Sequence, residues 1–312
     1  MSGSGRPRVA VSVGDLNGIG IELALRCHEK VSRRVEPLYM IDRDMLEQAA
    51  GLLELPIPQD FRILSPDAAP FSIRPGKVCA ESGAYAFASF KAGVELCAEK
   101  ESRALCTLPI HKEAWSLAGI PYKGHTDALR DFFGTEAIMM LGCPQMYVGL
   151  YTEHIPLRDV PGSLEEERLT RFLLDFLRET GATRIAVLGL NPHAGDGGVL
   201  GREEETIRRA IRRAEAHAGT SGVFIGPLVP DIAFTPAMRR QYTYYAALYH
   251  DQGLIPLKAL YFDESINVSL NLPILRTSVD HGTAFDIAYR NAPINTTSYL
   301  NALEYIRLRQ DA

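Results

Sequence analysis

The chain of 312 residues contains no apolar run long enough to span a bilayer. Its opening stretch, Met-Ser-Gly-Ser-Gly-Arg-Pro-Arg, lacks the hydrophobic segment of a signal peptide. Both absences argue against a membrane or secreted protein, so we expect a cytoplasmic location. Internal repeats and low-complexity linkers are absent too, which leaves only loops such as 121–124 as guides to a domain boundary.

Cysteine and positive charge are also limited. The five cysteines are an odd number without close pairing or metal-like spacing, as expected of reduced core residues. A net charge of −5 argues against nucleic acid or an anionic membrane as partner. The arginines that do cluster alternate with apolar residues at helical spacing, which is typical of a solvated helix face. They are Arg208, Arg209, Arg212 and Arg213.

Two nucleotide-binding fingerprints are missing. Gly14, Gly18 and Gly20 follow a predicted strand and open a predicted helix, but their spacing is not that of the GxGxxG motif. No Walker lysine follows them either. Any nicotinamide cofactor would therefore bind outside a Rossmann crevice.

Predicted strands and helices alternate along the chain, which indicates an α/β fold. With 46% hydrophobic residues, a chain of this length can bury a large core, and we expect two lobes. The strands are predicted at 8–13, 37–41, 104–107, 146–152, 184–188, 222–225, 246–249 and 267–272, and the helices at 18–31, 82–99, 125–133, 163–180 and 202–218.

Three histidines each follow an apolar, strand-like run and stand among polar residues or glycines: His154, His193 and His250. Imidazole is the commonest side-chain ligand of zinc, and three protein ligands with one open position describe a catalytic metal site. In α/β enzymes the chemistry gathers where strands end. The pattern therefore predicts a divalent-metal site, although each histidine taken alone is more often an ordinary packed residue.

Five blocks of sequence carry a resemblance to a known family. They are 14–20 (GDLNGIG), 124–127 (GHTD), 190–195 (LNPHAG), 249–258 (YHDQGLIPLK) and 276–284 (RTSVDHGTA). In order and spacing they resemble the 4-hydroxythreonine-4-phosphate dehydrogenase family, PdxA, over nearly the whole chain. The resemblance implies NAD-dependent oxidation of 4-phosphooxy-L-threonine with decarboxylation to 3-amino-2-oxopropyl phosphate, in pyridoxine 5'-phosphate (vitamin B6) biosynthesis.

The resemblance also implies a two-lobed α/β fold like that of isocitrate and isopropylmalate dehydrogenases, which is not a Rossmann fold. We expect a first lobe at 1–123 plus 282–312 and a second at 124–281 that carries the metal and substrate residues. By position in the family's motifs, the substrate would be held by His125, Thr126, Lys258, Asn267 and Arg276. The cofactor, NAD or alternatively NADP, would be held by His281, Gly282, Thr283, Ala284 and Asp286, where a helix is expected to begin.

A metal on the three histidines would bind the substrate hydroxyl and lower its pKa. Zinc is expected first, with cobalt or magnesium as alternatives. Asp251 and Asp231 are equal candidates for the catalytic base or for carboxylates that orient a ligating imidazole. The family further implies a homodimer with shared active sites, in which His154 and His193 come from one subunit and His250 from its partner.

The chain departs from the family's usual pattern at Leu16, Asn17 and Ile21 in the first loop, at His111, and at Asp127. These changes spare the metal and phosphate residues but leave the substrate preference open. A dehydrogenase of a 4-phosphorylated sugar acid, threonate or erythronate, is therefore the first alternative. A zinc hydrolase that works without NAD is the second, and a non-catalytic phosphate-ligand binding protein is the third.

Overall fold

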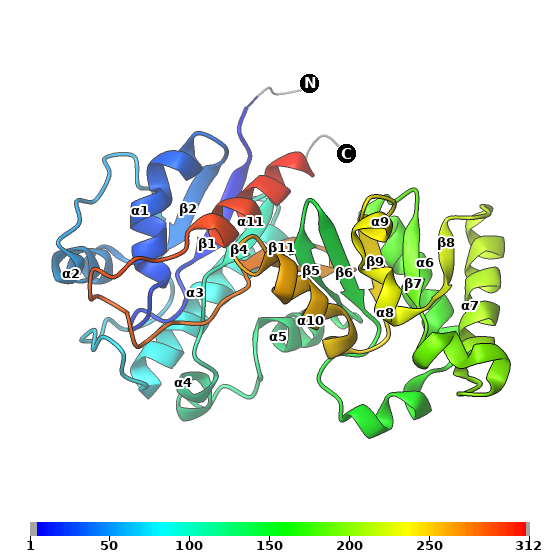
Figure 1. The fold of residues 1–312 in the computed structure, drawn as a ribbon. Coiled ribbons are helices and arrows are strands. Elements are labelled where there is room, and N and C mark those ends of the chain that lie inside the picture. Colours follow the sequence, from blue (N-terminus) through cyan, green and yellow to red (C-terminus); the bar gives the residue numbers. More distant parts are fainter. Residues whose placement is uncertain (1–4, 310–312) are drawn as a thin grey trace. The chain divides into compact units, whose positions relative to one another are not determined.

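The structure, a computed structural model, describes residues 5–309, and these form two compact α/β units (Figure 1). Unit 1 contains residues 5–135, 266–268 and 272–309, and unit 2 contains residues 136–265 and 269–271. These boundaries are not those of the predicted lobes. His125 and Arg276, which the sequence assigned to the second lobe, lie in unit 1.

Unit 1 is built on a parallel sheet in the order β3-β2-β1-β4-β11. Its strands are β1 (Arg8–Ser12), β2 (Glu36–Met40), β3 (Ile63–Leu64), β4 (Ala104–Thr107) and β11 (Leu275–Val279). Its helices are α1 (Gly20–Ser32), α2 (Arg43–Leu53), α3 (Ala80–Ala98), α4 (Lys112–Leu117), α5 (His125–Phe133) and α11 (Thr297–Leu308).

The two faces of the unit 1 sheet are covered by different helices, because successive side chains of a strand point to opposite faces. Ala10, Met40 and Leu105 share a core with Phe90 of α3 and Trp115 of α4. The neighbouring strand residue Tyr39 faces the other way, where its hydroxyl lies 3.0 Å from Nδ1 of His28 in α1. Strands that are buried on both faces explain why their sequences are continuous apolar runs.

Unit 2 contains a mixed sheet in the order β5-β6-β9-β7-β8, in which β5 and β6 form an antiparallel hairpin and the other pairs are parallel. Its strands are β5 (Ile138–Cys143), β6 (Met146–Leu150), β7 (Ile185–Leu188), β8 (Phe224–Leu228) and β9 (Tyr244–Ala247). Its helices are η1 (Leu157–Asp159), η2 (Pro161–Ser163), α6 (Glu166–Thr180), η3 (Pro192–Gly198), α7 (Glu203–Ala218), α8 (Pro230–Ala233), α9 (Pro236–Arg239) and α10 (His250–Tyr261). The last strand, β10 (Ile266–Leu270), supplies residues to both units.

Two glycines allow helices to approach β6 closely from its two faces. A Cβ at Gly149 would lie 2.7 Å from the ring of Phe176 in α6. On the other face, a Cβ at Gly253 of α10 would lie 2.3 Å from Cγ1 of Val148. Helix α10 packs against β5, β6 and β9, and this contact fixes the position of its first residue, His250.

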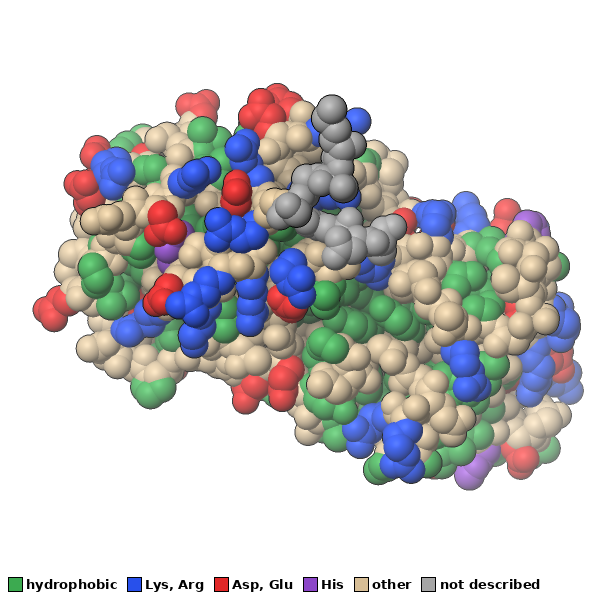
Figure 2. Space-filling model, turned by 90° about the horizontal axis from the view of Figure 1, so that it is seen from above, with side chains coloured by type: hydrophobic (Ala, Val, Ile, Leu, Met, Phe, Trp, Pro, Cys, Tyr) green, Lys and Arg blue, Asp and Glu red, His purple; other side chains and the backbone are tan. Residues whose placement is uncertain are grey.

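The surface of the described chain carries both charges. In Figure 2 positive and negative side chains lie interspersed over the face that is seen. The four clustered arginines are exposed on α7, while Ile207, Ala210, Ile211 and Ala214 of that helix are buried, which confirms the predicted amphipathic helix. Within residues 5–309, no helix combines the length and apolarity needed to cross a membrane.

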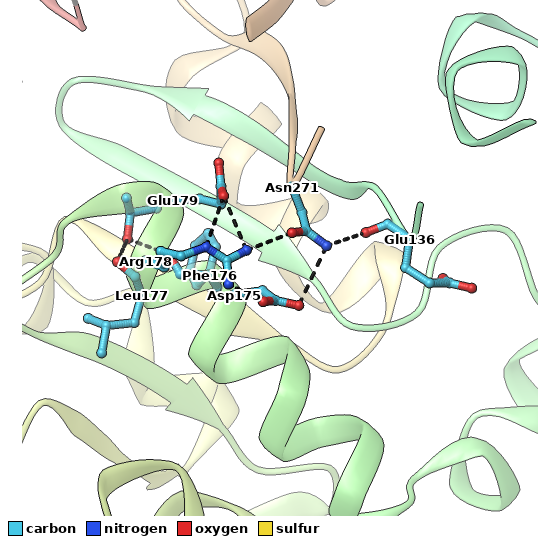
Figure 3. Close-up of polar contacts among 8 residues, drawn as sticks. Glu136, Asp175, Phe176, Leu177, Arg178, Glu179 and Asn271 are labelled. Carbon is cyan, nitrogen blue, oxygen red and sulfur yellow. Dashed lines mark hydrogen bonds and ion pairs between the residues drawn. The ribbon is translucent and has the colours of Figure 1, made fainter. Parts of the chain in front are cut away.

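A cluster of polar residues ties the end of α6 to two other segments of unit 2 (Figure 3). Arg178 donates hydrogen bonds of 2.7 Å to Asp175 Oδ1 and to Asn271 Oδ1. The amide nitrogen of Asn271 in turn donates to the carbonyl oxygen of Glu136 at 2.8 Å. Asn271 holds a left-handed backbone, with φ of 61°, so this turn depends on a residue that tolerates that conformation.

Most predicted elements are present with ends shifted by one to three residues, and all five cysteines are buried and free. One local prediction is wrong. No helix begins at Gly282, because residues 285–291 form turns, with positive φ at Ala284, Tyr289 and Asn291. The apolar run 254–257 lies inside helix α10.

Candidate functional site

The three histidines follow three neighbouring strands of unit 2. His154 follows β6, His250 follows β9 and His193 follows β7, and these strands are adjacent and parallel in the order β6-β9-β7. The carboxyl ends of parallel strands meet at one edge of a sheet, which is where α/β folds hold ligands. The prediction that each histidine follows a strand end is therefore confirmed.

His154 and His250 lie beside each other. Their ring centroids are 5.4 Å apart and the rings are tilted by 43°. Two imidazoles on one tetrahedral zinc, with Zn–N bonds of about 2.0 Å, place their centroids about 5 Å apart. Nδ1 of His250 donates to Oδ1 of Asp251 at 2.6 Å, which leaves Nε2 as the nitrogen that can ligate a metal. This pair has the donor chemistry and the spacing of two metal ligands.

His193 lies on a loop whose backbone is held in an unusual conformation. From His193 to Gly197 every residue has a positive φ, with values of 53° at His193 and 50° at Ala194. Left-handed backbone is costly for residues other than glycine, so it persists only where the surroundings impose it. The loop therefore needs a specific restraint.

Glu204, in the first turn of α7, supplies that restraint. Its carboxylate accepts hydrogen bonds from the amides of Leu190 at 2.9 Å and Asn191 at 2.7 Å, and from Nδ2 of Asn191 at 2.9 Å. Glu204 is 2% exposed, and a Cβ on Gly195 would meet its Oε2 at 2.6 Å. Glu204 was not among the residues predicted from the sequence; its signal is an acidic residue in the first turn of a helix that follows a glycine-rich loop.

Within residues 5–309 of one chain, no group of three or more histidine, cysteine or acidic side chains is placed to hold a metal ion. The chain thus brings together His154 and His250 but does not add His193 to them. Asp231 lies exposed on α8, a helix that packs against the loop carrying His193. Lys258 lies on α10 with Nζ 5.5 Å from the ring centre of Phe262.

Unit 1 holds a second set of predicted residues around the first turn of α5. Arg276 on β11 is 2% exposed, and its Nη2 lies 3.2 Å from Nδ1 of His125, the first residue of α5. Thr126 follows in the same turn and is also buried. A helix N-terminus presents free backbone amides, so a buried guanidinium beside it forms a cradle for an anion.

The two basic residues of this cradle differ in charge. Burial lowers the pKa of Arg276 to about 10, which still leaves the guanidinium charged at neutral pH. Burial, and then the positive charge of Arg276, hold the pKa of His125 well below its ordinary value of 6.5, so its imidazole is neutral. Nε2 of His125 is buried and has no hydrogen-bond partner among the described residues. Oδ1 of Asn267, on β10, is likewise buried without such a partner.

The segment predicted to hold the cofactor packs against the first loop of unit 1. The amide of Ile19 donates to the carbonyl oxygen of Thr283 at 3.0 Å. Nε2 of His281 is buried without a hydrogen-bond partner among the described residues. Since no helix starts here, the segment 281–286 can offer a ligand side chains and single amides, but no helix N-terminus.

The residues that depart from the family pattern have structural contacts. Asn17 accepts from the amide of Arg74 at 2.8 Å and donates to the carbonyl oxygen of Lys77 at 2.7 Å, so it anchors the segment before α3. Asp127 accepts from the amide of Lys123 at 2.9 Å. His111 stacks on Phe285, with ring centroids 4.8 Å apart. Asn17 and Asp127 therefore have local structural roles, and His111 lies beside Phe285 of the segment 281–286.

Comparison with known proteins gives consistent matches over the chain. The sequence profile of the family described as "Pyridoxal phosphate biosynthetic protein PdxA" matches residues 33–306. A Sulfurimonas denitrificans protein named 4-hydroxythreonine-4-phosphate dehydrogenase is 57% identical over 297 residues, 95% of this chain and 96% of that protein. A Campylobacter fetus protein of the same name is 48% identical over 300 residues, 96% of this chain and 97% of that protein. The crystal structure of a 4-hydroxythreonine-4-phosphate dehydrogenase from Burkholderia phymatum matches with a TM-score of 0.80 at 32% identity, covering 97% of this chain and 98% of that one.

Proposed function

The chain belongs to the PdxA family of pyridoxal phosphate biosynthetic proteins, and we propose that it is an NAD-dependent 4-hydroxythreonine-4-phosphate dehydrogenase. Its substrate is 4-phosphooxy-L-threonine and its product, after decarboxylation, is 3-amino-2-oxopropyl phosphate. The observation that carries the proposal is the cradle of buried Arg276 and His125 at the N-terminus of α5. A phosphomonoester dianion is the ligand for which such donors are suited.

In this proposal the phosphate contacts are made by His125, Thr126, Asn267 and Arg276, with Lys258 as a further cation. Arg276 supplies a fixed positive charge, and neutral His125 supplies polar contact without adding a second charge to the buried cradle. Binding of the phosphate holds the rest of the substrate in a fixed position, which is how remote binding energy assists the reacting carbon.

The metal residues in the proposal are His154, His193 and His250, with zinc as the first expectation and cobalt or magnesium as alternatives. The pair His154 and His250 fits a metal in spacing and donor type. We propose a homodimer with shared active sites. The family resemblance assigns His154 and His193 to one subunit and His250 to its partner, whereas one chain places His154 beside His250 without adding His193. We therefore propose that the second copy supplies His193 instead of His250. A divalent metal bound there would lower the pKa of the substrate hydroxyl and stabilise negative charge on its oxygen.

A residue of the chain would accept the proton that the substrate hydroxyl loses on oxidation. A bound nicotinamide would accept the hydride from the hydroxyl-bearing carbon, and the hydroxyl proton would pass to a base of the chain. Asp251 and Asp231 remain the candidates, and the contact of Asp251 with Nδ1 of His250 favours Asp251 as the residue that orients that imidazole. Loss of CO2 from the resulting β-keto acid leaves its electron pair as an enolate, which takes up one proton to give the product ketone.

The nicotinamide cofactor, NAD in the first instance and NADP as an alternative, is proposed to contact His281, Gly282, Thr283, Ala284 and Asp286. The support for this assignment is the buried Nε2 of His281 and the close packing of the segment on the first loop. Because no helix begins there, we expect side chains and single amides to make the contacts. A cytoplasmic location stays a prediction.

The test is NADH formation by the purified protein with 4-phosphooxy-L-threonine, NAD and a divalent metal. A chelated sample and a sample with threonate 4-phosphate run in parallel. The proposal is supported if NADH forms from the amine-bearing substrate and if the chelator abolishes its formation. NADH from the sugar acid alone would make the protein a sugar-acid phosphate dehydrogenase, and phosphate release or hydrolysis without NAD would point to the hydrolase.

A further inference from the structure

A third residue, Thr107, contacts the anion cradle of unit 1 from the adjacent strand. In the parallel pair of β4 and β11, Arg276 is in register with Leu105, and Ser278 is in register with Thr107. Residues two apart on a strand share a face, so the side chains of Thr107 and Arg276 lie on the same face of the sheet. Thr107 is the last residue of β4 and is fully buried.

The hydroxyl of Thr107 holds one edge of the Arg276 guanidinium. Oγ1 accepts from Nη2 at 2.7 Å and from Nε at 3.2 Å. Two contacts from a planar group to one oxygen fix the rotation of that plane, because the five N–H donors of arginine have fixed directions. The orientation of Nη2 toward His125 therefore depends on Thr107.

The contact between Arg276 and His125 determines which imidazole nitrogen carries the proton. A guanidinium is a donor only, so Nδ1 of His125, 3.2 Å from Nη2, has to be the acceptor. The ring is neutral because its pKa is well below 6.5, and its single proton is then on Nε2. Phe90 and Trp115 pack against the ring, with centroids at 4.8 Å and 5.4 Å, and keep it from turning over.

We propose that Thr107 is a positioning residue for phosphate recognition: through Arg276 it holds His125 in the tautomer that presents Nε2–H as a donor. This inference rests on the proposed function, in which the cradle takes the phosphate of the substrate. The buried Nε2, without a partner among the described residues, is the donor that a phosphate oxygen would satisfy. A phosphomonoester dianion only accepts hydrogen bonds in this contact, so the other tautomer would oppose an imidazole lone pair to a phosphate oxygen.

The test compares Thr107→Val with Thr107→Ser. Valine keeps the shape of threonine and removes the acceptor, whereas serine keeps the acceptor. We expect Thr107→Val to raise KM for the phosphorylated substrate by about tenfold with little change in kcat, and Thr107→Ser to restore most of the wild-type KM. A thermal unfolding curve of each variant shows that the fold is retained.

A second measurement reports the tautomer without turnover. Nitrogen-15 NMR of labelled histidine distinguishes Nε2–H from Nδ1–H, with His125→Gln used to assign the signal. We expect wild-type His125 to be the Nε2–H tautomer and Thr107→Val to give a mixture, and inorganic phosphate should shift the wild-type signal more than the variant's. A wild-type Nδ1–H tautomer, an unchanged KM in Thr107→Val, or equal effects of valine and serine would each overturn the inference. If wild-type protein shows neither turnover nor a phosphate-induced shift, the proposed function fails instead.

Discussion

Glu204 is expected to control the order of the loop that carries His193, and Glu204→Gln tests this with almost no change in shape. One carboxylate oxygen accepts hydrogen bonds from the backbone amides of Leu190 and Asn191, and the other accepts one from Nδ2 of Asn191. In the glutamine variant, the amide oxygen can keep the two backbone contacts without charge assistance, and the new NH2 group opposes Nδ2 of Asn191.

The size of the effect follows from these contacts. A hydrogen bond to a charged acceptor contributes about 1.5–3 kcal/mol and a neutral one about 0.5–1.5 kcal/mol. Weakening two contacts and losing the third should make opening of the loop easier by about 2 kcal/mol, allowing for relaxation of the Asn191 side chain. Since 1.4 kcal/mol is a factor of ten, the amides of Leu190 and Asn191 should exchange their hydrogens roughly 30-fold faster.

Amide hydrogen exchange of residues 189–196, followed by mass spectrometry or NMR, measures this directly. Glu203→Gln is the matched control, because Glu203 accepts from Nδ2 of Asn191 and from the amide of Arg202 but from neither of the two reporting amides. Wild-type exchange rates in Glu204→Gln, or an equal acceleration in Glu203→Gln, would refute the restraint that we assign to Glu204.

Three further predictions concern the cradle and the stability of each unit. Arg276→Ala should raise KM for the phosphorylated substrate by about 10- to 100-fold, because a charge-assisted contact is lost; steady-state kinetics with unchanged KM would remove Arg276 from the phosphate site. Because the pKa of folded His125 lies well below 6.5, only the unfolded chain gains a proton there as the pH falls below about 6.5. His125 should therefore lower the free energy of unfolding by about 1.4 kcal/mol for each pH unit below that value. The free energy of unfolding of His125→Gln, measured with urea, should fall less steeply with pH than that of the wild type; the same slope in both proteins would contradict the assignment. Asn271→Ala and Asn271→Gly both lose the contact with Arg178, but only alanine is strained by the left-handed φ of 61°. The alanine variant should therefore have a free energy of unfolding about 1 kcal/mol lower than the glycine variant; equal values would show that the turn is unstrained.

The local sequence pattern was sufficient to predict most strands and helices, because the buried face of each element determines how its apolar residues are spaced along the chain. The apolar run of β4 and the helical spacing of apolar residues in α7 are examples. It was insufficient at 254–257, where four residues do not distinguish a buried helix from a strand, and the close approach of Gly253 to Val148 decides in favour of a helix. At 285–291 the backbone turns that replace the expected helix are set by packing on the first loop, which no local pattern reports.

Some functional residues were identified from the sequence and others only from the structure. Those identified from the sequence came from short sequence blocks, and the three strand ends were predicted correctly from apolar runs followed by polar residues. The role of Thr107 was not predictable, since it acts on Arg276, 169 residues later in the sequence, and stands in no motif that marks chemistry. Glu204 was marked only by its place in the first turn of a helix that follows a glycine-rich loop.

The sequence by itself determined the α/β class, the family and the side chains with the right chemistry, because composition, periodicity and motif order are properties of the chain alone. Only the tertiary structure decided which of those side chains meet. It placed His154 beside His250 without His193, and it buried Arg276 against Thr107 and His125. Burial then determined the charges of the cradle, since removing water favours neutral imidazole and lowers the pKa of the guanidinium, an effect that depends on three-dimensional surroundings and on no stretch of sequence.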